Sequence, residues 1–157
     1  MTDARFEDGA DLPLRLMAQG VDDVPVLSAL LQDAVFPIGE MRWDRKRRRF
    51  ALMVNRFRWE DRDAAERAAR GYERVQAVLV VEGVLSVQSQ GIDRGDRDMV
   101  LSVLELAFAA GADGAGRLTL ALAGDGAIAL DVEALDLSLQ DVTRPYLAPS
   151  GKVPSHD

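Results

Sequence analysis

Two stretches of this chain are weak copies of each other, and this internal similarity constrains the fold more than any other sequence feature. Residues 14–22, Leu-Arg-Leu-Met-Ala-Gln-Gly-Val-Asp, align with residues 85–93, Leu-Ser-Val-Gln-Ser-Gln-Gly-Ile-Asp, and residues 50–54 are echoed in the same order by residues 128–132. Short alternating runs of Val, Leu and Ala also align by chance, so coincidence stays open as an alternative. We predict two related β-rich units in tandem.

The first unit has the pattern of a strand, a helix and a hairpin. Apolar and polar residues alternate over residues 13–19, as in a half-buried strand, and apolar residues at helical spacing predict a helix from about residue 23 to residue 33. Alternation on both sides of a basic turn at 45–48 predicts a β-hairpin. After Val54 the apolar positions shift by one residue, which indicates either a β-bulge or a twist that hands the strand to a different face.

The second unit has the same hairpin with a clearer turn. Residues 118–122 and 128–132 alternate around a Gly-Asp-Gly turn at 124–126, a strong hairpin signal because glycine adopts positive φ readily. The apolar positions then shift again, to 135, 137 and 139. The matched shift is the best support for the repeat.

The connections in the second unit leave two alternatives open. Residues 76–89 predict either one long strand or a hairpin pinched at Gly83. A short helix is predicted from about residue 96 to residue 104, and residues 106–109 fit either a strand or the continuation of that helix. The glycine-rich residues 111–116 predict a loop.

These patterns predict the α+β class, with mainly antiparallel β-structure and two tandem β-rich repeats that each carry one short helix. The repeats run from about 11 to 60 and from about 82 to 141, and an alanine-rich, charged helix at 60–71 links them. A chain of this length fits a single domain, which we place at 1–146. Residues 147–157 predict an irregular tail.

Composition excludes several kinds of chemistry. The chain has 157 residues and no cysteine, which excludes disulfides, thiolate metal sites and a cysteine nucleophile. The one histidine, His156, is next to the last residue, where a side chain is rarely held firmly enough for general acid–base catalysis. We predict no cofactor.

Charge and hydropathy constrain the surroundings of the protein. The net charge of -7 argues against a protein that binds nucleic acid with its whole surface. Residues 1–8 are acidic and lack the apolar segment of a secretory signal. The longest apolar tract, 99–110, is shorter than the about 20 residues that span a membrane. We therefore predict a cytoplasmic protein without membrane contact.

A group of carboxylates forms a candidate metal site. Asp131 and Glu133 share one face of a predicted strand about 7 Å apart, and the shift after Val132 brings Asp136 near Glu133 in one reading of the hairpin. Oxygen ligands of this kind suit Mg²⁺ or Ca²⁺. The simpler interpretation is the solvent face of an amphipathic strand.

One local surplus of positive charge stands out in this acidic chain. Seven arginines and one lysine between residues 42 and 58 are interleaved with Trp43, Phe57 and Trp59. Guanidinium groups and aromatic rings together suit an RNA backbone and its bases, and an acidic protein partner suits the patch equally well. Alternatively, these basic residues form a solvated hairpin tip that protects a sheet edge from aggregation and binds no ligand.

Part of this basic segment resembles a known family. Residues 48–60, Arg-Arg-Phe-Ala-Leu-Met-Val-Asn-Arg-Phe-Arg-Trp-Glu, preceded by Leu-Gln-Asp-Ala-Val at 31–35, are similar to uncharacterised bacterial proteins catalogued as domain of unknown function 2948. The resemblance extends through 91–93, the hairpin at 123–128 and the Pro-Ser-His-Asp ending at 154–157. It implies a stand-alone cytoplasmic protein with no assigned activity, and it draws attention to the Asn-Arg-Phe-x-Trp-Glu run.

From these features we predict a non-catalytic cytoplasmic module that binds an unknown protein partner or associates with itself. The predicted binding residues are Arg49, Asn55, Arg56, Arg58, Trp59 and Glu60. For Asn55, Arg56, Trp59 and Glu60, a structural role in holding the strand after its shift is an alternative. RNA binding through the arginine hairpin and a metal-dependent enzyme centred on Asp131, Glu133 and Asp136 are further alternatives.

Overall fold

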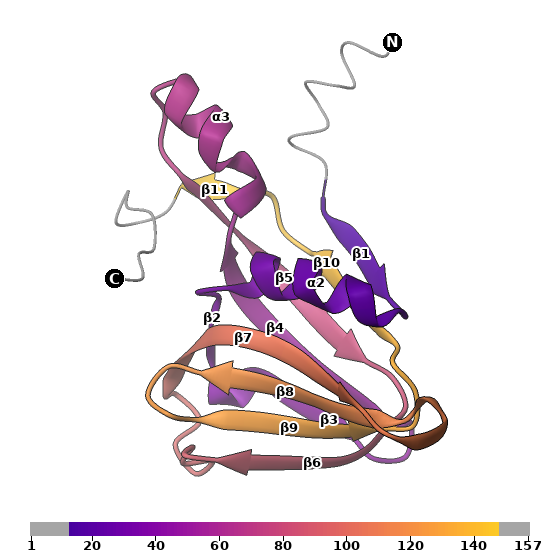
Figure 1. Cartoon of the computed structure of the whole chain (residues 1–157). Coiled ribbons are helices and arrows are strands. Elements are labelled where there is room, and N and C mark those ends of the chain that lie inside the picture. The colour runs from indigo at the N-terminus through magenta and orange to yellow at the C-terminus, as the bar shows by residue number, and fades with distance from the viewer. Residues whose placement is uncertain (1–12, 148–157) are drawn as a thin grey trace.

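The computed structural model describes residues 13–147, which form a strongly curved sheet with two short α-helices (Figure 1). His156 and residues 1–8 lie outside the described residues, as does the tail predicted at 147–157 apart from Leu147. None of the helices within residues 13–147 is both long enough and apolar enough to cross a membrane.

The elements follow one another with short connections. The strands of the described residues are β1 (Arg15–Ala18), β2 (Val35–Pro37), β3 (Met41–Asp44), β4 (Arg49–Phe57), β5 (Glu73–Val81), β6 (Val84–Gln90), β7 (Val100–Ala110), β8 (Gly116–Leu122), β9 (Ala127–Val132), β10 (Leu137–Asp141) and β11 (Tyr146–Leu147). The α-helices are α2 (Val24–Leu31) and α3 (Arg62–Arg67), and the 3₁₀ turns are η1 (Val21–Asp23), η2 (Ile38–Glu40), η3 (Trp59–Asp61) and η4 (Ala112–Gly114).

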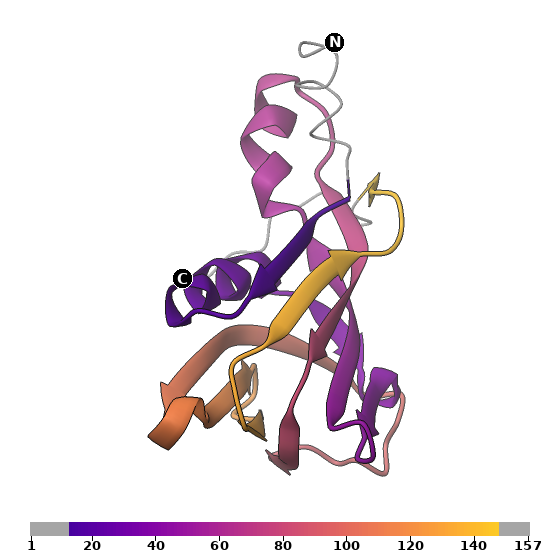
Figure 2. The same ribbon diagram turned by 90° about the vertical axis from the view of Figure 1, so that its right-hand side faces the viewer.

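The strands are joined in the order β1-β10-β5-β4-β2-β7-β8-β9-β6, with β3 added to β4 and β11 added to β5. Each of these pairs is antiparallel. The predicted α+β class with mainly antiparallel strands is therefore confirmed. The sheet bends so that the β7-β8-β9-β6 portion lies at an angle to β4, β5 and β10, and α3 projects beyond them (Figures 1 and 2).

Burial of apolar side chains holds the two portions of the sheet together. Alternate residues of β4, β5, β8, β9 and β10 point into one buried cluster that draws on both halves of the chain. Helix α2 packs against β7, β4 and β1. Pro25 in its first turn supplies a backbone φ suited to a helix start, and Val24, Leu27 and Leu31 are its buried face.

The helix predicted at 96–104 is wrong, because this region enters the long strand β7. Residues 101 and 103 are buried in the alternating pattern of a strand, but a register shift between Val103 and Glu105 moves the next buried residue to Leu106. A β-bulge of this kind inserts one extra residue, so the buried spacing imitates that of a helix. The second half of the described chain consequently has no α-helix, only the turn η4.

The strands predicted within residues 76–89 are present, but they form neither one long strand nor a hairpin. Strands β5 and β6 are separate and pair with different neighbours, β5 with β4, β10 and β11, and β6 with β9. The chain turns between β5 and β6 at Gly83, whose φ is 69°. Glycine adopts this backbone conformation readily, whereas L-residues with a side chain adopt it at a cost in energy.

The two shifts of the apolar pattern have different causes. In β4 the register against β5 runs without a break from Phe50 to Phe57, so no bulge is present. Arg56 instead takes the inward position that follows Val54, and Phe57 is buried on the other face beside Trp59. The second shift is a change of strand, because β9 ends at Val132 and the chain continues in β10.

The repeat stays a prediction. The aligned strands do not have corresponding partners, since β1 pairs with β10 whereas β6 pairs with β9. The linking helix predicted at 60–71 is present as η3 followed by α3. The described parts of both predicted repeats contribute to the same buried cluster.

Candidate functional site

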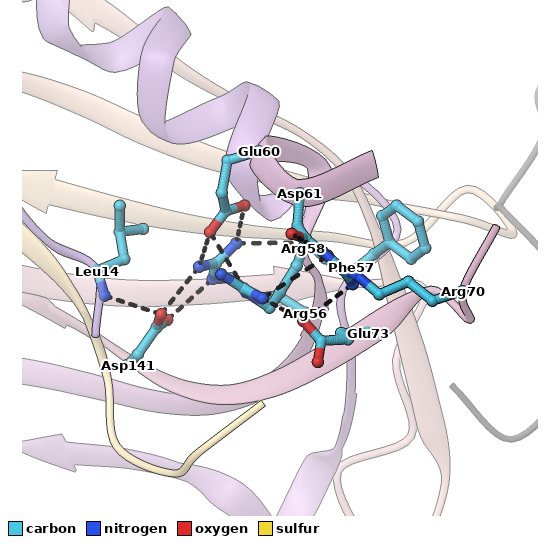
Figure 3. A network of polar contacts seen from close by, with 9 residues as sticks. All are labelled: Leu14, Arg56, Phe57, Arg58, Glu60, Asp61, Arg70, Glu73 and Asp141. Atoms are coloured by element: carbon cyan, nitrogen blue, oxygen red, sulfur yellow. Dashed lines mark hydrogen bonds and ion pairs between the residues drawn. The ribbon is translucent and has the colours of Figure 1, made fainter. Parts of the chain in front are cut away.

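The Asn-Arg-Phe-x-Trp-Glu run centres on a buried arginine. The Arg56 side chain is 0% exposed, and its guanidinium donates to Glu60 at 2.9 and 2.7 Å and to Asp141 at 3.0 Å through each of two nitrogens (Figure 3). Asp141 also accepts the Leu14 N–H at 2.9 Å. This arginine therefore joins the end of β4 to β10 and to the residue that precedes β1.

The charges of this group are mutually stabilised. Burial alone favours the neutral form of Arg56, but the hydrogen bonds and charges of Glu60 and Asp141 outweigh it and hold the pKa of Arg56 above its ordinary value. Burial likewise works to raise the pKa of Glu60, and Arg56 outweighs it, so the pKa of Glu60 is lowered.

A second cluster of charges lies beside the first (Figure 3). Arg58 is 4% exposed in its side chain and bonds to the Glu73 carboxylate, with Asp61 at 3.8 Å. Its backbone N–H donates to the Glu73 carbonyl at 2.9 Å. Asp61 accepts two hydrogen bonds from Arg70, at 2.8 and 2.7 Å. The two clusters fasten η3 and the residues after α3 to the ends of β4 and β5.

Acid is expected to destabilise the fold through this second cluster. The Arg70 hydrogen bonds hold the pKa of Asp61 below its ordinary value of 3.8. A lowered pKa stabilises the folded state while the carboxylate is charged, so this contribution is complete above about pH 5 and is lost as the pH falls below about 4. Urea unfolding between about pH 7 and pH 3 is expected to show a smaller acid-induced loss for Arg70→Ala than for the wild type. Arg67→Ala is the control, and an unchanged pH dependence in Arg70→Ala contradicts the assignment.

The remaining predicted binding residues are held in other contacts. Asn55 accepts a hydrogen bond from the Tyr146 hydroxyl. The half-buried Trp59 donates from Nε1 to the Gln32 carbonyl at 2.9 Å, and its ring meets Phe57 edge-on at 4.6 Å between centroids. Exposed Arg49 lies at the other end of β4.

Arg49 forms an ion pair with Glu82 at 2.5 Å. The structure thus gathers Asn55, Arg56, Arg58, Trp59 and Glu60 at the outer end of β4 and places Arg49 apart from them.

In the alternative metal site, the carboxylates of Asp131 and Glu133 are each bonded to a different arginine. Asp131 accepts bonds from Arg117 at 2.8 Å and from the Ser86 hydroxyl at 2.9 Å, and Arg117 lowers the pKa of Asp131. Glu133 pairs with Arg48 at 2.9 Å. Within residues 13–147 no group of three or more His, Asp or Glu side chains is arranged to hold a metal ion. Glu133 and Asp136 line one small pocket, but the structure does not bring Asp131, Glu133 and Asp136 together as a metal-binding group.

A cleft of about 590 Å³ lies between β3 and β6. Its apolar lining includes Trp43 and Phe50, which pair across β3 and β4 at the edge of the core. The apolar residues that line the cleft are Ile38, Met41, Trp43, Phe50, Leu85, Val87 and Ile128. Two backbone bonds join the neighbouring segments, one from the Val84 N–H to the Arg48 carbonyl at 2.8 Å and one from the Gly39 N–H to the Arg97 carbonyl at 2.9 Å.

Three exposed arginines line the same cleft, namely Arg45, Arg94 and Arg97. Within the described part of the chain none of these three guanidinium groups makes an ion pair with a carboxylate. Arg97 donates one long hydrogen bond, 3.4 Å, to the Gly39 carbonyl. The cleft thus combines an apolar floor with three arginines that form no ion pair within the described residues.

Sequence reasoning missed two of these arginines. Arg94 and Arg97 lie in an Asp-Arg-Gly-Asp-Arg-Asp run with no net positive charge, which resembles an ordinary solvated loop. The fold changes this balance, because Asp93 accepts the Gly95 N–H at 3.0 Å within the turn while both arginines line the cleft. No local sequence signal joins them to Arg45, which belongs to the predicted hairpin.

A second groove, of about 510 Å³, runs between α2 and β7. Its lining is mostly apolar and includes Val21, Pro25, Leu104 and Phe108, and Glu105 is its one charged residue among those described. It therefore has no concentration of charge to select a ligand.

Comparison with known protein families identifies a match. A family described as proteins of unknown function, DUF2948, matches residues 14–156. No curated protein and no solved structure matches the chain. The matched range contains both the Asn55–Glu60 segment and the three cleft arginines. The chain therefore belongs to the DUF2948 family of proteins of unknown function.

Proposed function

We propose that this protein is a non-catalytic, cytoplasmic interaction module that binds an acidic, partly apolar segment of a partner protein in the cleft between β3 and β6. The observation that carries the proposal is the set of three cleft arginines without a carboxylate partner in residues 13–147, beside apolar side chains of which Leu85 is exposed. Complementary charge steers encounter and selects partners, and an apolar floor supplies burial.

The composition of the cleft favours a protein over RNA. RNA-binding surfaces track a phosphate backbone with many cations and stack bases on exposed aromatic faces. Here the net charge is -7, the cleft has three arginines, and its one tryptophan, Trp43, is half-buried against the core. Apolar residues make up most of the remaining lining.

In this proposal the basic hairpin keeps the role that its sequence predicts, but the contacting residues differ. Trp43 and Arg45 of the hairpin border the cleft. Arg56 and Arg58 are buried in ion pairs, so they serve as supports for β4 and β5, together with Glu60. Exposed Arg49 lies at the start of β4, one residue from Phe50 of the cleft floor.

Affinity purification of the tagged full chain from its source cells, followed by mass spectrometry, tests the proposal. A triple variant with Arg45, Arg94 and Arg97 changed to Ala is expected to retain the specific protein partner at least about tenfold less than the wild type, since each arginine contributes a charge-assisted bond.

A matched control keeps the same change of net charge. Arg47, Arg62 and Arg67 are exposed and do not line the cleft, so their triple Ala variant is expected to retain the partner. Equal retention by the cleft variant contradicts the proposal. Co-purified RNA whose retention depends on the cleft arginines and falls steeply with salt supports the RNA alternative instead.

A further inference from the structure

We infer that the acidic segment binds as an added antiparallel or parallel β-strand along the free edge of β6. This inference rests on the proposed function and specifies how the cleft holds its partner. Strand addition of this kind takes affinity from backbone hydrogen bonds and specificity from alternate side chains.

The edge of β6 that borders the cleft is open after Val84, whose N–H bonds to the Arg48 carbonyl. Strand β6 is the last strand in the sheet order and pairs with β9 on one side within residues 13–147. Ser86 and Val87, which are neighbours in sequence, both line the cleft. Successive side chains of a strand point to opposite faces, so the cleft meets β6 along its edge and not at one face.

The hydrogen-bond ladder shows which backbone groups of β6 are free. The Leu122 N–H donates to the Gly126 carbonyl at 2.8 Å, which sets the phase of the β8–β9 pair. The backbone groups of Gly126, Ile128, Leu130 and Val132 therefore bond to β8. Those of Ala127, Ala129 and Asp131 bond to β6. Their partners in β6 are Ser86, Gln88 and Gln90. The N–H and C=O groups of Val87 and Ser89 consequently point away from β9.

An independent contact supports this phase. The same alternation, carried from β8 into β7, directs the backbone of Leu106 away from β8. The Leu106 N–H does point that way, because it donates to the Ser28 hydroxyl of α2 at 3.0 Å. Strand β7 is thus capped there by a side chain, whereas Val87 and Ser89 face the cleft.

Strand β6 also lacks the usual protection of an edge. Exposed edges commonly carry a charge or a proline that prevents further pairing. The seven residues of β6, Val-Leu-Ser-Val-Gln-Ser-Gln, contain neither, and Leu85 is 52% exposed. A bulge between Val84 and Ser86 is the one protective feature of the strand. At the opposite end of the sheet order, β1 carries Arg15.

The arrangement of charge selects an acidic strand as the occupant. Arg45 belongs to the turn whose Arg48 carbonyl bonds the first residue of β6, and Arg94 and Arg97 follow its last residue. A strand along β6 therefore has cations near both of its ends and an apolar floor between them. A second copy of this chain fits less well, since its β6 offers no carboxylate to these arginines.

A random-peptide library displayed on phage and selected on the full chain supplies a probe. The expected enriched sequences alternate apolar residues with others and carry Asp or Glu near their ends. No enrichment, or enrichment of basic sequences, contradicts both the inference and the proposed function. A dimer that forms through β6 without a peptide supports self-association instead and overturns the inference.

A proline variant separates strand addition from side-chain binding. Ser89→Pro removes an outward N–H while the β6–β9 ladder keeps its bonds, as proline on an edge strand allows. Strand addition predicts that an enriched acidic peptide binds Ser89→Pro at least about tenfold more weakly than the wild type. Ser89→Ala keeps the N–H and is expected to bind normally.

Hydrogen exchange of the wild-type complex gives a second measurement that does not depend on the folding of a variant. Strand addition predicts at least about tenfold slower exchange of the Val87 and Ser89 amides in the complex. If the peptide binds in an arginine-dependent manner while these two amides exchange as in the free protein, the proposed function stands and the strand-addition inference is overturned.

Discussion

Replacing Arg56 with Met is expected to destabilise the protein by about 3–5 kcal/mol, the usual cost of removing one partner of a buried ion pair. Methionine retains much of the apolar volume of the arginine side chain. The lost stability is therefore due mainly to the missing guanidinium charge. The substitution leaves the Asp141 carboxylate, 4% exposed, without its guanidinium partner. The measurement is urea unfolding at neutral pH, followed by circular dichroism.

Two further variants separate charge from packing. Adding Asp141→Asn to Arg56→Met is expected to recover part of the stability, because the amide oxygen still accepts the Leu14 N–H and no uncompensated charge remains at residue 141. Arg49→Ala removes an exposed ion pair with Glu82 and is expected to cost less than about 1 kcal/mol. A similar, small loss in Arg56→Met and Arg49→Ala contradicts a structural role for the buried arginine.

Gly116→Ala is expected to cost about 2–3 kcal/mol, because the start of β8 has no room for a methyl group. An added Cβ meets the Phe108 ring at 2.5 Å and the Ala109 carbonyl oxygen at 2.6 Å. A side chain can rotate away, but this carbonyl belongs to the β7–β8 ladder and moves only with the strand. Unfolding in urea measures the loss.

Gly111→Ala is the matched control at the other end of the same turn. The nearest atom to a Cβ there is the Ala115 carbonyl oxygen at 3.4 Å, an ordinary contact. This variant is expected to stay within about 0.5 kcal/mol of the wild type. If Gly116→Ala is equally mild, the β7–β8 packing described here is incorrect.

The spacing of apolar residues correctly predicted those strands in which buried and exposed side chains alternate. The alternation around residues 45–48 and 124–126 identified both hairpins, and helical spacing identified α2. It failed in β7, since the bulge between Val103 and Glu105 changes the spacing of buried residues and conceals the strand. The partner strands of β5 and β6 also depend on contacts distant in sequence, which periodicity does not encode.

The buried arginine shows a second limit of sequence pattern. The missing apolar residue after Val54 was detected as a shift, but a charged residue at an inward position was not expected. Its carboxylate partner Asp141 lies 85 positions away, beyond the reach of any local rule. The same is true of the cleft, where folding brings Arg45 to the loop that contains Arg94 and Arg97.

The most specific part of the family resemblance makes contacts between elements of the fold. Within the Asn55–Glu60 run, Arg56 and Glu60 fasten β4 to β10 and η3, and Trp59 bonds to the residue after α2. A stable junction at this end of the sheet leaves the β3–β6 cleft as the site for recognition in our account.

Amide chemical shifts recorded by NMR while an enriched acidic peptide is added test the location of the binding site most directly. Our account expects the largest changes at residues 41–45, 85–89 and 94–97, and their loss in the triple variant of the cleft arginines. Changes centred on residues 55–60, or on the α2–β7 groove at 104–108, contradict the claim that the cleft between β3 and β6 is the binding site.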